Sequence, residues 1–180
     1  MMTTLRQQFE EAGIALRKEV PADIREAADT IDDAETLLIV MGGTVEEGVP
    51  MSDQIWHFDM ASIHGPGDYA AIAAELCRLS GGALAITDIA DEFDAKNERA
   101  YLSFTYQEQR HMWEFAVDGD WTDTNIFVGF EHLLAQAGTG LRFTCYAWEG
   151  SDGLIGCATP EQVERIAELT GVRFEWLIAD

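Results

Sequence analysis

The stretch Tyr101–Trp121, YLSFTYQEQRHMWEFAVDGDW, decides the fold that this sequence predicts. Apolar and aromatic residues take every second position in 101–106 and again in 112–117: Leu102, Phe104 and Tyr106, then Trp113, Phe115 and Val117. Alternation with a period of two, carried by aromatic and β-branched residues, is typical of half-buried strands. We therefore predict two strands joined through the short polar link 107–110, forming a hairpin in the centre of a sheet.

Helical and strand patterns are interspersed around this hairpin without regular alternation. Helices are expected over 3–18, from Pro21 onward, over 69–79 with Asp68 as its cap, from Thr122 or Asp123 to 137, and from Pro160 to 169. Strands are expected over 37–41, 55–58, 83–87, 141–148, 154–157 and 174–178. Since several strands are adjacent along the chain, the pattern favours an α+β fold with a mostly antiparallel sheet and packed helices.

The best-marked helix start is Thr159-Pro160-Glu161-Gln162, a capping box with proline at the first helical position. The 180 residues, of which 47% are hydrophobic, suit one globular domain over 1–180.

The charge balance is strongly acidic. Thirty-three acidic residues face eleven basic ones, which gives a formal net charge of −22. Such a chain repels nucleic acid and anionic membranes and attracts basic proteins and cations. Solubility and adaptation to high internal salt are competing explanations of the same composition.

Three cysteines, Cys77, Cys145 and Cys157, form no C-x-x-C pair, and their odd number fits buried thiols in a reducing compartment. The first residues have no apolar signal core, and no apolar run is long enough to cross a bilayer. The expected location is the cytoplasm.

Two acidic segments are candidate binding regions. The first is an expected loop over 88–97 with Asp88, Asp91, Glu92 and Asp94. The second is the turn Asp118-Gly119-Asp120-Trp121-Thr122-Asp123, in which Asp123 is placed to serve the next helix. Neither matches an EF-hand loop, so no metal and no cofactor is expected at either.

His57, Asp59 and His64 are the candidates for a metal or acid–base site, because His57 and Asp59 share a strand face. A histidine hydrogen-bonded at a strand edge is the alternative. For nucleophilic chemistry, Cys145 and Cys157 would be the nucleophiles and His111 or His132 the bases, although the alternation around Cys145 indicates simple burial.

Tryptophans near strand ends have acidic residues close in sequence: Trp56, Trp121 and Trp148. Aromatic anchors ringed by charge have the composition of a protein-binding hot spot, and burial in the core is the competing explanation.

The segments GDYAAIAAELCRLSGGALAITDIADEFD and YLSFTYQEQRHMWEFAVDGDWTD make the chain resemble the small acidic α+β immunity proteins of bacterial polymorphic toxin systems. The resemblance covers roughly residues 54 to 123 and rests on the order of the expected elements and on the acidic composition rather than on a motif. It implies a cytoplasmic inhibitor that covers the active site of a cognate toxin, often a basic nuclease.

The leading hypothesis is therefore a non-catalytic protein-binding inhibitor with no nucleic-acid or membrane partner. Its partner-binding residues would be Asp88, Asp91, Glu92, Asp94, Asp118, Asp120, Trp121 and Asp123. The alternatives are a metal-dependent hydrolase at His57, Asp59 and His64, and a structural module whose acidity reflects a saline habitat.

Overall fold

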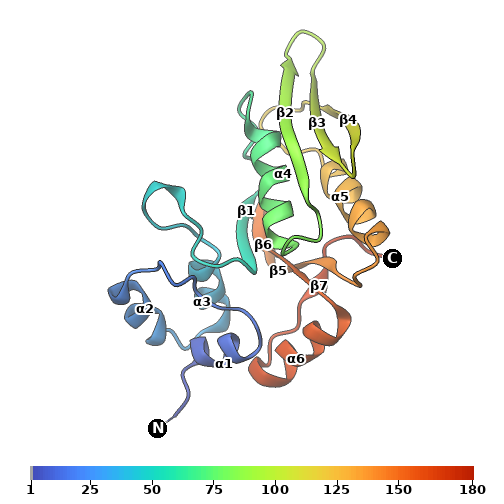
Figure 1. Ribbon diagram of the computed structural model, residues 1–180. Coiled ribbons are helices and arrows are strands. Elements are labelled where there is room, and N and C mark those ends of the chain that lie inside the picture. Colours follow the sequence, from blue (N-terminus) through green and yellow to red (C-terminus); the bar gives the residue numbers. More distant parts are fainter. Residues whose placement is uncertain (1) are drawn as a thin grey trace. The chain divides into compact units, whose positions relative to one another are not determined.

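A computed structural model describes residues 2–180 of the chain (Figure 1). Its contacts divide the chain into two compact units: a terminal unit, made of the residues up to 58 and from 140 onward, and a central unit of residues 59–139. The expectation of one globular domain stays a prediction. Both units combine helices with an antiparallel sheet, which confirms the α+β class.

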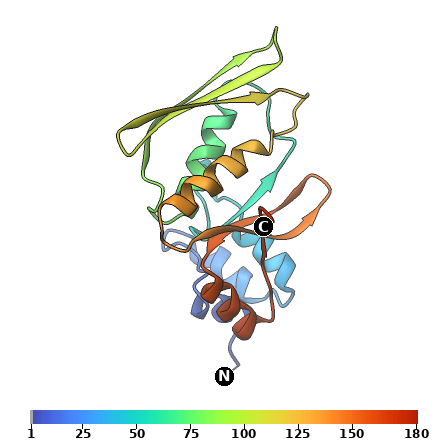
Figure 2. The ribbon, with the colours of Figure 1, turned by 90° about the vertical axis from the view of Figure 1, so that its right-hand side faces the viewer.

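The central unit contains the predicted hairpin. Strands β2 (Ile86–Asp94), β3 (Arg99–Tyr106) and β4 (Gln109–Ala116) form a sheet in the order β2-β3-β4. The link between β3 and β4 is only Gln107-Glu108, both with positive φ, as in a tight two-residue hairpin turn. Figure 2 shows α4 (Asp68–Leu79) and α5 (Asn125–Gln136) on the same side of this sheet.

Aromatic residues fill the layer between this sheet and its helices. Phe104 of β3 lies with its ring centroid 4.9 Å from Trp113 and 5.4 Å from Phe130 of α5. Tyr69 of α4 stacks on Phe115 at 4.7 Å. The 3.6-residue period of each helix places its buried residues on one face: Tyr69, Ile72, Ala73, Leu76 and Leu79 in α4, and Ile126, Phe127, Phe130, Leu133 and Leu134 in α5.

The expected acidic loop over 88–97 is wrong, because its first seven residues belong to β2. Along β2, Ala90 and Glu92 are exposed, and the residues that alternate with them, Ile89, Asp91 and Phe93, are half-buried. A bulge near Asp88, whose φ is 54°, shifts the register between Thr87 and Ala90. An edge strand tolerates such charges on its solvent face, and they protect it from pairing with other chains.

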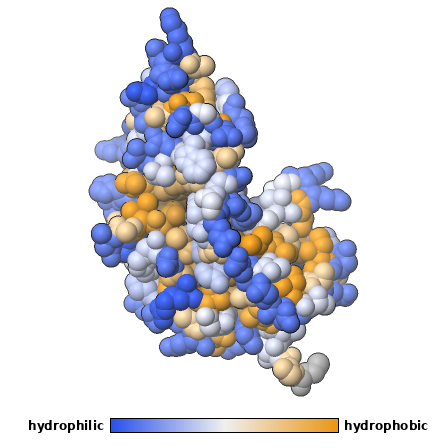
Figure 3. Space-filling model, turned by 180° about the vertical axis from the view of Figure 1, so that it is seen from behind, coloured by the Kyte–Doolittle hydropathy of each residue, from blue (hydrophilic) through white to orange (hydrophobic). Residues whose placement is uncertain are grey.

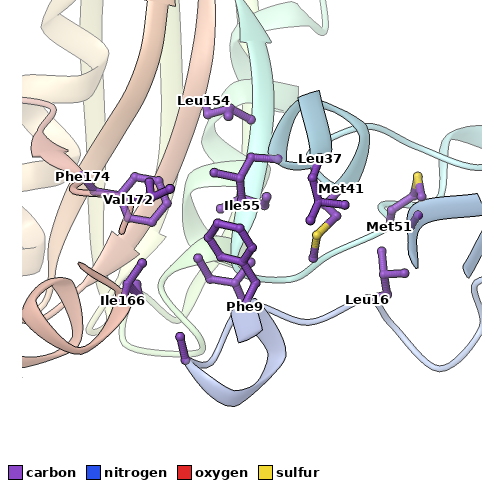
Figure 4. Packing of buried hydrophobic residues seen from close by; sticks show 14 of the residues in the cluster. Phe9, Leu16, Leu37, Met41, Met51, Ile55, Leu154, Ile166, Val172 and Phe174 are labelled. Carbon is purple, nitrogen blue, oxygen red and sulfur yellow. The ribbon is translucent and has the colours of Figure 1, made fainter. Parts of the chain in front are cut away.

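The terminal unit has a sheet in the order β1-β6-β5-β7, made of β1 (Ile55–Asp59), β6 (Asp152–Ala158), β5 (Arg142–Glu149) and β7 (Glu175–Trp176). Its helices are α1 (Leu5–Glu11), α2 (Ala22–Asp29), α3 (Ala34–Met41), the 3₁₀ turn η1 (Glu46–Gly48) and α6 (Pro160–Thr170). Figure 4 shows Phe9, Ile55, Leu154 and Ile166 among the side chains that form its aliphatic core. The capping box at Thr159 and Gln162 is confirmed.

Three other expectations in these elements are wrong. The run 37–41 is helical, because Asp33 caps α3 through the N–H of Thr36 and the buried Leu37, Leu38 and Met41 share one helical face. The first helix ends at Glu11 instead of 18, and the last strand keeps only Glu175 and Trp176. Short apolar runs do not distinguish a strand from a buried helix by periodicity alone.

Candidate functional site

The outer face of the central sheet carries cross-strand rows of side chains. Glu92, Tyr101 and Glu114 form one row, and Ala90, Ser103 and Met112 form the next. Met112 has an exposed fraction of 71%, unusually high for a large apolar side chain in the middle of a strand. This face therefore presents both carboxylates and apolar surface to solvent.

Arginines on the same face are engaged within the sheet. The guanidinium of Arg110 donates to the Asp88 carbonyl oxygen at 2.8 Å and to Ser103 Oγ at 2.9 Å. Arg99 Nε lies 3.1 Å from Glu114 Oε1. These contacts hold the positive charge close to the strands.

Asp91 is half-buried and bonded within the fold, although the sequence predicts that it binds a partner. Its two carboxylate oxygens accept hydrogen bonds from Gly67 N at 2.6 Å and Ala70 N at 2.9 Å, at the first turn of α4. Asp68, the predicted cap, instead accepts from the preceding backbone at His64 and Gly65. A carboxylate at this position satisfies N–H groups that lack intrahelical partners and complements the helix dipole.

Asp94 and Asp123 also bond within the fold. Asp94 accepts from the backbone N–H and the side-chain amide of Asn97 in the β2–β3 turn, and the side-chain hydrogen bond, with the backbone bond second, lowers its pKa below the ordinary value of 3.8. Asp123 accepts from Ala116 N at 2.9 Å and Asn125 N at 3.0 Å, which confirms that it serves the start of α5.

The remaining predicted carboxylates face solvent. Those of Glu92, Asp118 and Asp120 make no hydrogen bond or ion pair within residues 2–180, and that of Asp88 has only a 3.5 Å contact with Thr87 Oγ1. Asp118 and Asp120 flank Gly119 in the turn that leads to Trp121.

Trp121 is 44% exposed and lines a shallow hollow of about 280 Å³. Asp118 lies at the same hollow, together with Ala116 and residues 122–124. An aromatic ring beside unpaired carboxylates is suited to contact a basic protein surface, where the ring supplies contact area and the acids supply charge complementarity.

The predicted metal site does not assemble. His57 Nε2 lies 2.8 Å from Asp152 Oδ2, so its partner is a residue of β6, and the Asp59 carboxylate accepts from Ala61 N. Within residues 2–180 no three His, Cys, Asp or Glu side chains are grouped as metal ligands. The alternative of a hydrogen-bonded strand histidine describes His57.

The three cysteines are half-buried and form no disulfide within residues 2–180. Burial raises the pKa of Cys77 to about 12, and burial followed by the charge of Glu175 raises the pKa of Cys145. A thiol with a raised pKa stays protonated and is a poor nucleophile. The interpretation of Cys145 as a packed thiol is therefore the better one.

One surface feature escaped the sequence analysis. A hollow of about 410 Å³ lies between β4 and α5, lined by His111, Trp113, Val128, Gly129, His132, Leu133 and Gln136. Gly129 was the available signal, because a Cβ there would lie 2.7 Å from the Trp113 ring. The glycine lets the indole lie against the helix and leaves the groove beside it open.

Comparison with known proteins finds no match, whether to a family model, a curated protein or a solved structure. Among the helices of residues 2–180, none has the length and apolar character needed to cross a membrane.

Proposed function

We propose that this protein is a non-catalytic inhibitor of the immunity type, which binds a cognate basic toxin and neutralises it by occlusion. The observation that carries the proposal is the set of exposed carboxylates on the central unit together with the exposed Trp121: those of Glu92, Asp118 and Asp120 make no hydrogen bond or ion pair within residues 2–180, and that of Asp88 has only its 3.5 Å contact with the neighbouring Thr87. Acids used only to stabilise the fold would be bonded as Asp91 is.

The proposed mechanism has an electrostatic and a steric part. With a net charge of −22, the protein attracts a cationic partner over long range, which raises the association rate. The exposed carboxylates then occupy the positions where a nuclease would bind phosphates, while the apolar surface of Met112 and Trp121 excludes water.

We place the inhibitor in the cytoplasm, which the lack of a disulfide among Cys77, Cys145 and Cys157 favours because reducing compartments keep cysteines as thiols. The metal-dependent hydrolase is not proposed further, because His57, Asp59 and His64 do not form a ligand group.

The test is capture from a lysate of the source organism at low salt, followed by elution with a salt gradient. The bait is compared with a variant carrying Asp88→Asn, Glu92→Gln, Asp118→Asn and Asp120→Asn. We expect a stoichiometric basic protein that elutes from the variant at clearly lower salt, because screening acts on the same charges that the variant removes.

A matched control variant separates the effect of these four carboxylates from the effect of net charge alone. Asp23→Asn, Glu26→Gln, Asp32→Asn and Glu168→Gln remove the same charge from exposed helix or loop positions of the terminal unit. Unchanged elution from this control supports the proposal, and so does loss of the captured protein's toxic activity at equimolar inhibitor. Equal weakening by both variants, or retention indifferent to salt, would contradict it.

A further inference from the structure

The outer edge of β4 offers unpaired backbone groups. β4 is at one end of the strand order, so within residues 2–180 β3 is its only strand neighbour. In an antiparallel sheet successive residues direct their N–H and C=O groups alternately to the two sides. Ala116 N bonds to the Asp123 carboxylate and therefore points away from β3. Because the direction alternates along the strand, Arg110, Met112 and Glu114 also direct their backbone N–H and C=O groups away from β3.

The opposite edge of the sheet is protected, whereas this edge is open. β2 has a bulge at Asp88 and a row of acidic residues, which are features that discourage strand pairing. β4 pairs with β3 from Gln109 to Ala116 without a register shift and contains no proline. Among the described residues, Asp123 bonds to the outer edge of β4, and it does so at the last residue, Ala116.

Beneath the open edge lies the hollow between β4 and α5. Its floor is held rigidly, since Trp113 packs edge-on against Phe130 and His111 stacks on Phe104 with centroids 5.0 Å apart. Val128 on the helix side is 46% exposed. Seen from behind, apolar surface gathers where α5 lies, below the hydrophilic tip of the β2–β3 hairpin (Figure 3).

We propose that β4 binds an extended segment of the toxin by strand addition, with alternate apolar side chains of that segment entering the hollow against α5. This inference rests on the proposed function and names its binding mode. Outward backbone groups select an extended main chain, and the hollow selects apolar residues at every second position.

The residues between those apolar positions face the outer side of the sheet, next to Glu114 of β4. They are therefore expected to be lysine or arginine. A second copy of this chain is the disfavoured occupant, because two molecules of charge −22 repel each other and both edges would bring the same acids together.

The first experiment uses the full chain and a synthetic peptide of the same length as β4, eight residues, that alternates valine with lysine. Two control peptides replace lysine by glutamate, or carry N-methyl groups on alternate backbone nitrogens. We expect the amide resonances of Arg110, Met112 and Glu114 to shift more than those of His111 and Trp113. Both controls should bind at least about tenfold more weakly, because one loses charge and the other loses backbone hydrogen bonds.

Variants then test the hollow. Val128→Arg places a bulky cation on its exposed rim without disturbing the core and should weaken the valine–lysine peptide about tenfold. Val40→Arg, at a comparably exposed helical valine of the terminal unit, is the matched control and should leave binding unchanged. Equal binding of the N-methylated peptide would overturn the proposal in favour of general charge attraction. A dimer in sedimentation that Val128→Arg dissociates would overturn it in favour of a second copy.

The captured toxin separates this inference from the proposed function. If neutralising Asp88, Glu92, Asp118 and Asp120 weakens the toxin complex but Val128→Arg does not, the inhibitor stands and strand addition is wrong. If the lysate holds no basic partner, the inhibitor proposal is wrong. The binding of a toxin segment to β4 is then wrong as well, even if the synthetic peptide binds.

Discussion

The two edges of the central sheet differ although they belong to the same three strands. β2 is acidic, bulged at Asp88 and bonded to α4 through Asp91. β4 is evenly paired, rich in aromatic residues and bordered by a hollow. The acidic edge is thus closed to strand pairing, and the less acidic edge is open. Acid density along the sequence therefore does not by itself locate an interface.

Neighbouring residues of β2 show the same lesson on a smaller scale. Asp91 turns inward and accepts two backbone hydrogen bonds, whereas the next residue, Glu92, turns outward and accepts none within residues 2–180. The pleat of the strand sends successive side chains to opposite faces. One acid stabilises the fold, and its neighbour remains available to a partner.

The largest expected effect is a loss of stability on removing the aromatic ring that packs beneath β4. Phe104→Ala removes a fully buried ring that contacts His111, Trp113 and Phe130, and should destabilise the protein by about 3–5 kcal/mol. Met112→Ala, on the exposed face of the same hairpin, should change the free energy of unfolding by no more than about 0.5 kcal/mol. Urea denaturation measures both, and similar losses for the two variants would mean that the outer face is covered in solution.

A smaller loss of stability is expected from substitutions in β2. Asp91→Ala leaves the N–H groups of Gly67 and Ala70 without their acceptor and should cost about 1–2 kcal/mol, in the range of a lost helix cap. Glu92→Ala removes the same charge from the outer face and should cost less than about 0.5 kcal/mol. A loss from Glu92→Ala as large as that from Asp91→Ala would refute the division between bonded and available acids.

Much of the fold was predictable because its signals are local. The hairpin followed from the alternation around Phe104, and α6 followed from the capping box at Thr159. The helix over 37–41 was missed because its cap, Asp33, stands outside the apolar run. The strand over 88–94 was missed because four acids conceal its period, which pairing with β3 restores.

The candidate site was predictable in composition but not in geometry. The sequence picked out the acids of both segments, yet it could not show that Asp91 accepts from Gly67 N and Ala70 N, or that Asp123 also accepts from Ala116 N at the end of β4. The open β4 edge depends on strand order, which no local pattern carries. Gly129 was visible, but its meaning requires the position of Trp113.

The smallest expected effect is a change in the pKa of Asp94 at the end of β2. This residue is intermediate between the acids bonded within the fold, such as Asp91, and the unbonded ones, such as Glu92. Its folded-state pKa is lowered first by the Asn97 side chain, so Asn97→Ala should raise that pKa toward 3.8, with the remaining backbone bond keeping it somewhat lower. Because the folded pKa is the depressed one, this contribution to stability is present above the ordinary pKa and is lost as pH falls through the folded value. Carboxyl carbon NMR over about pH 2 to 6 follows the titration. Asp33, whose pKa the Thr36 side chain lowers, is the internal control and should not move. An unchanged Asp94 would mean that its carboxylate is free in solution, which would move it from the bonded acids to the unbonded ones.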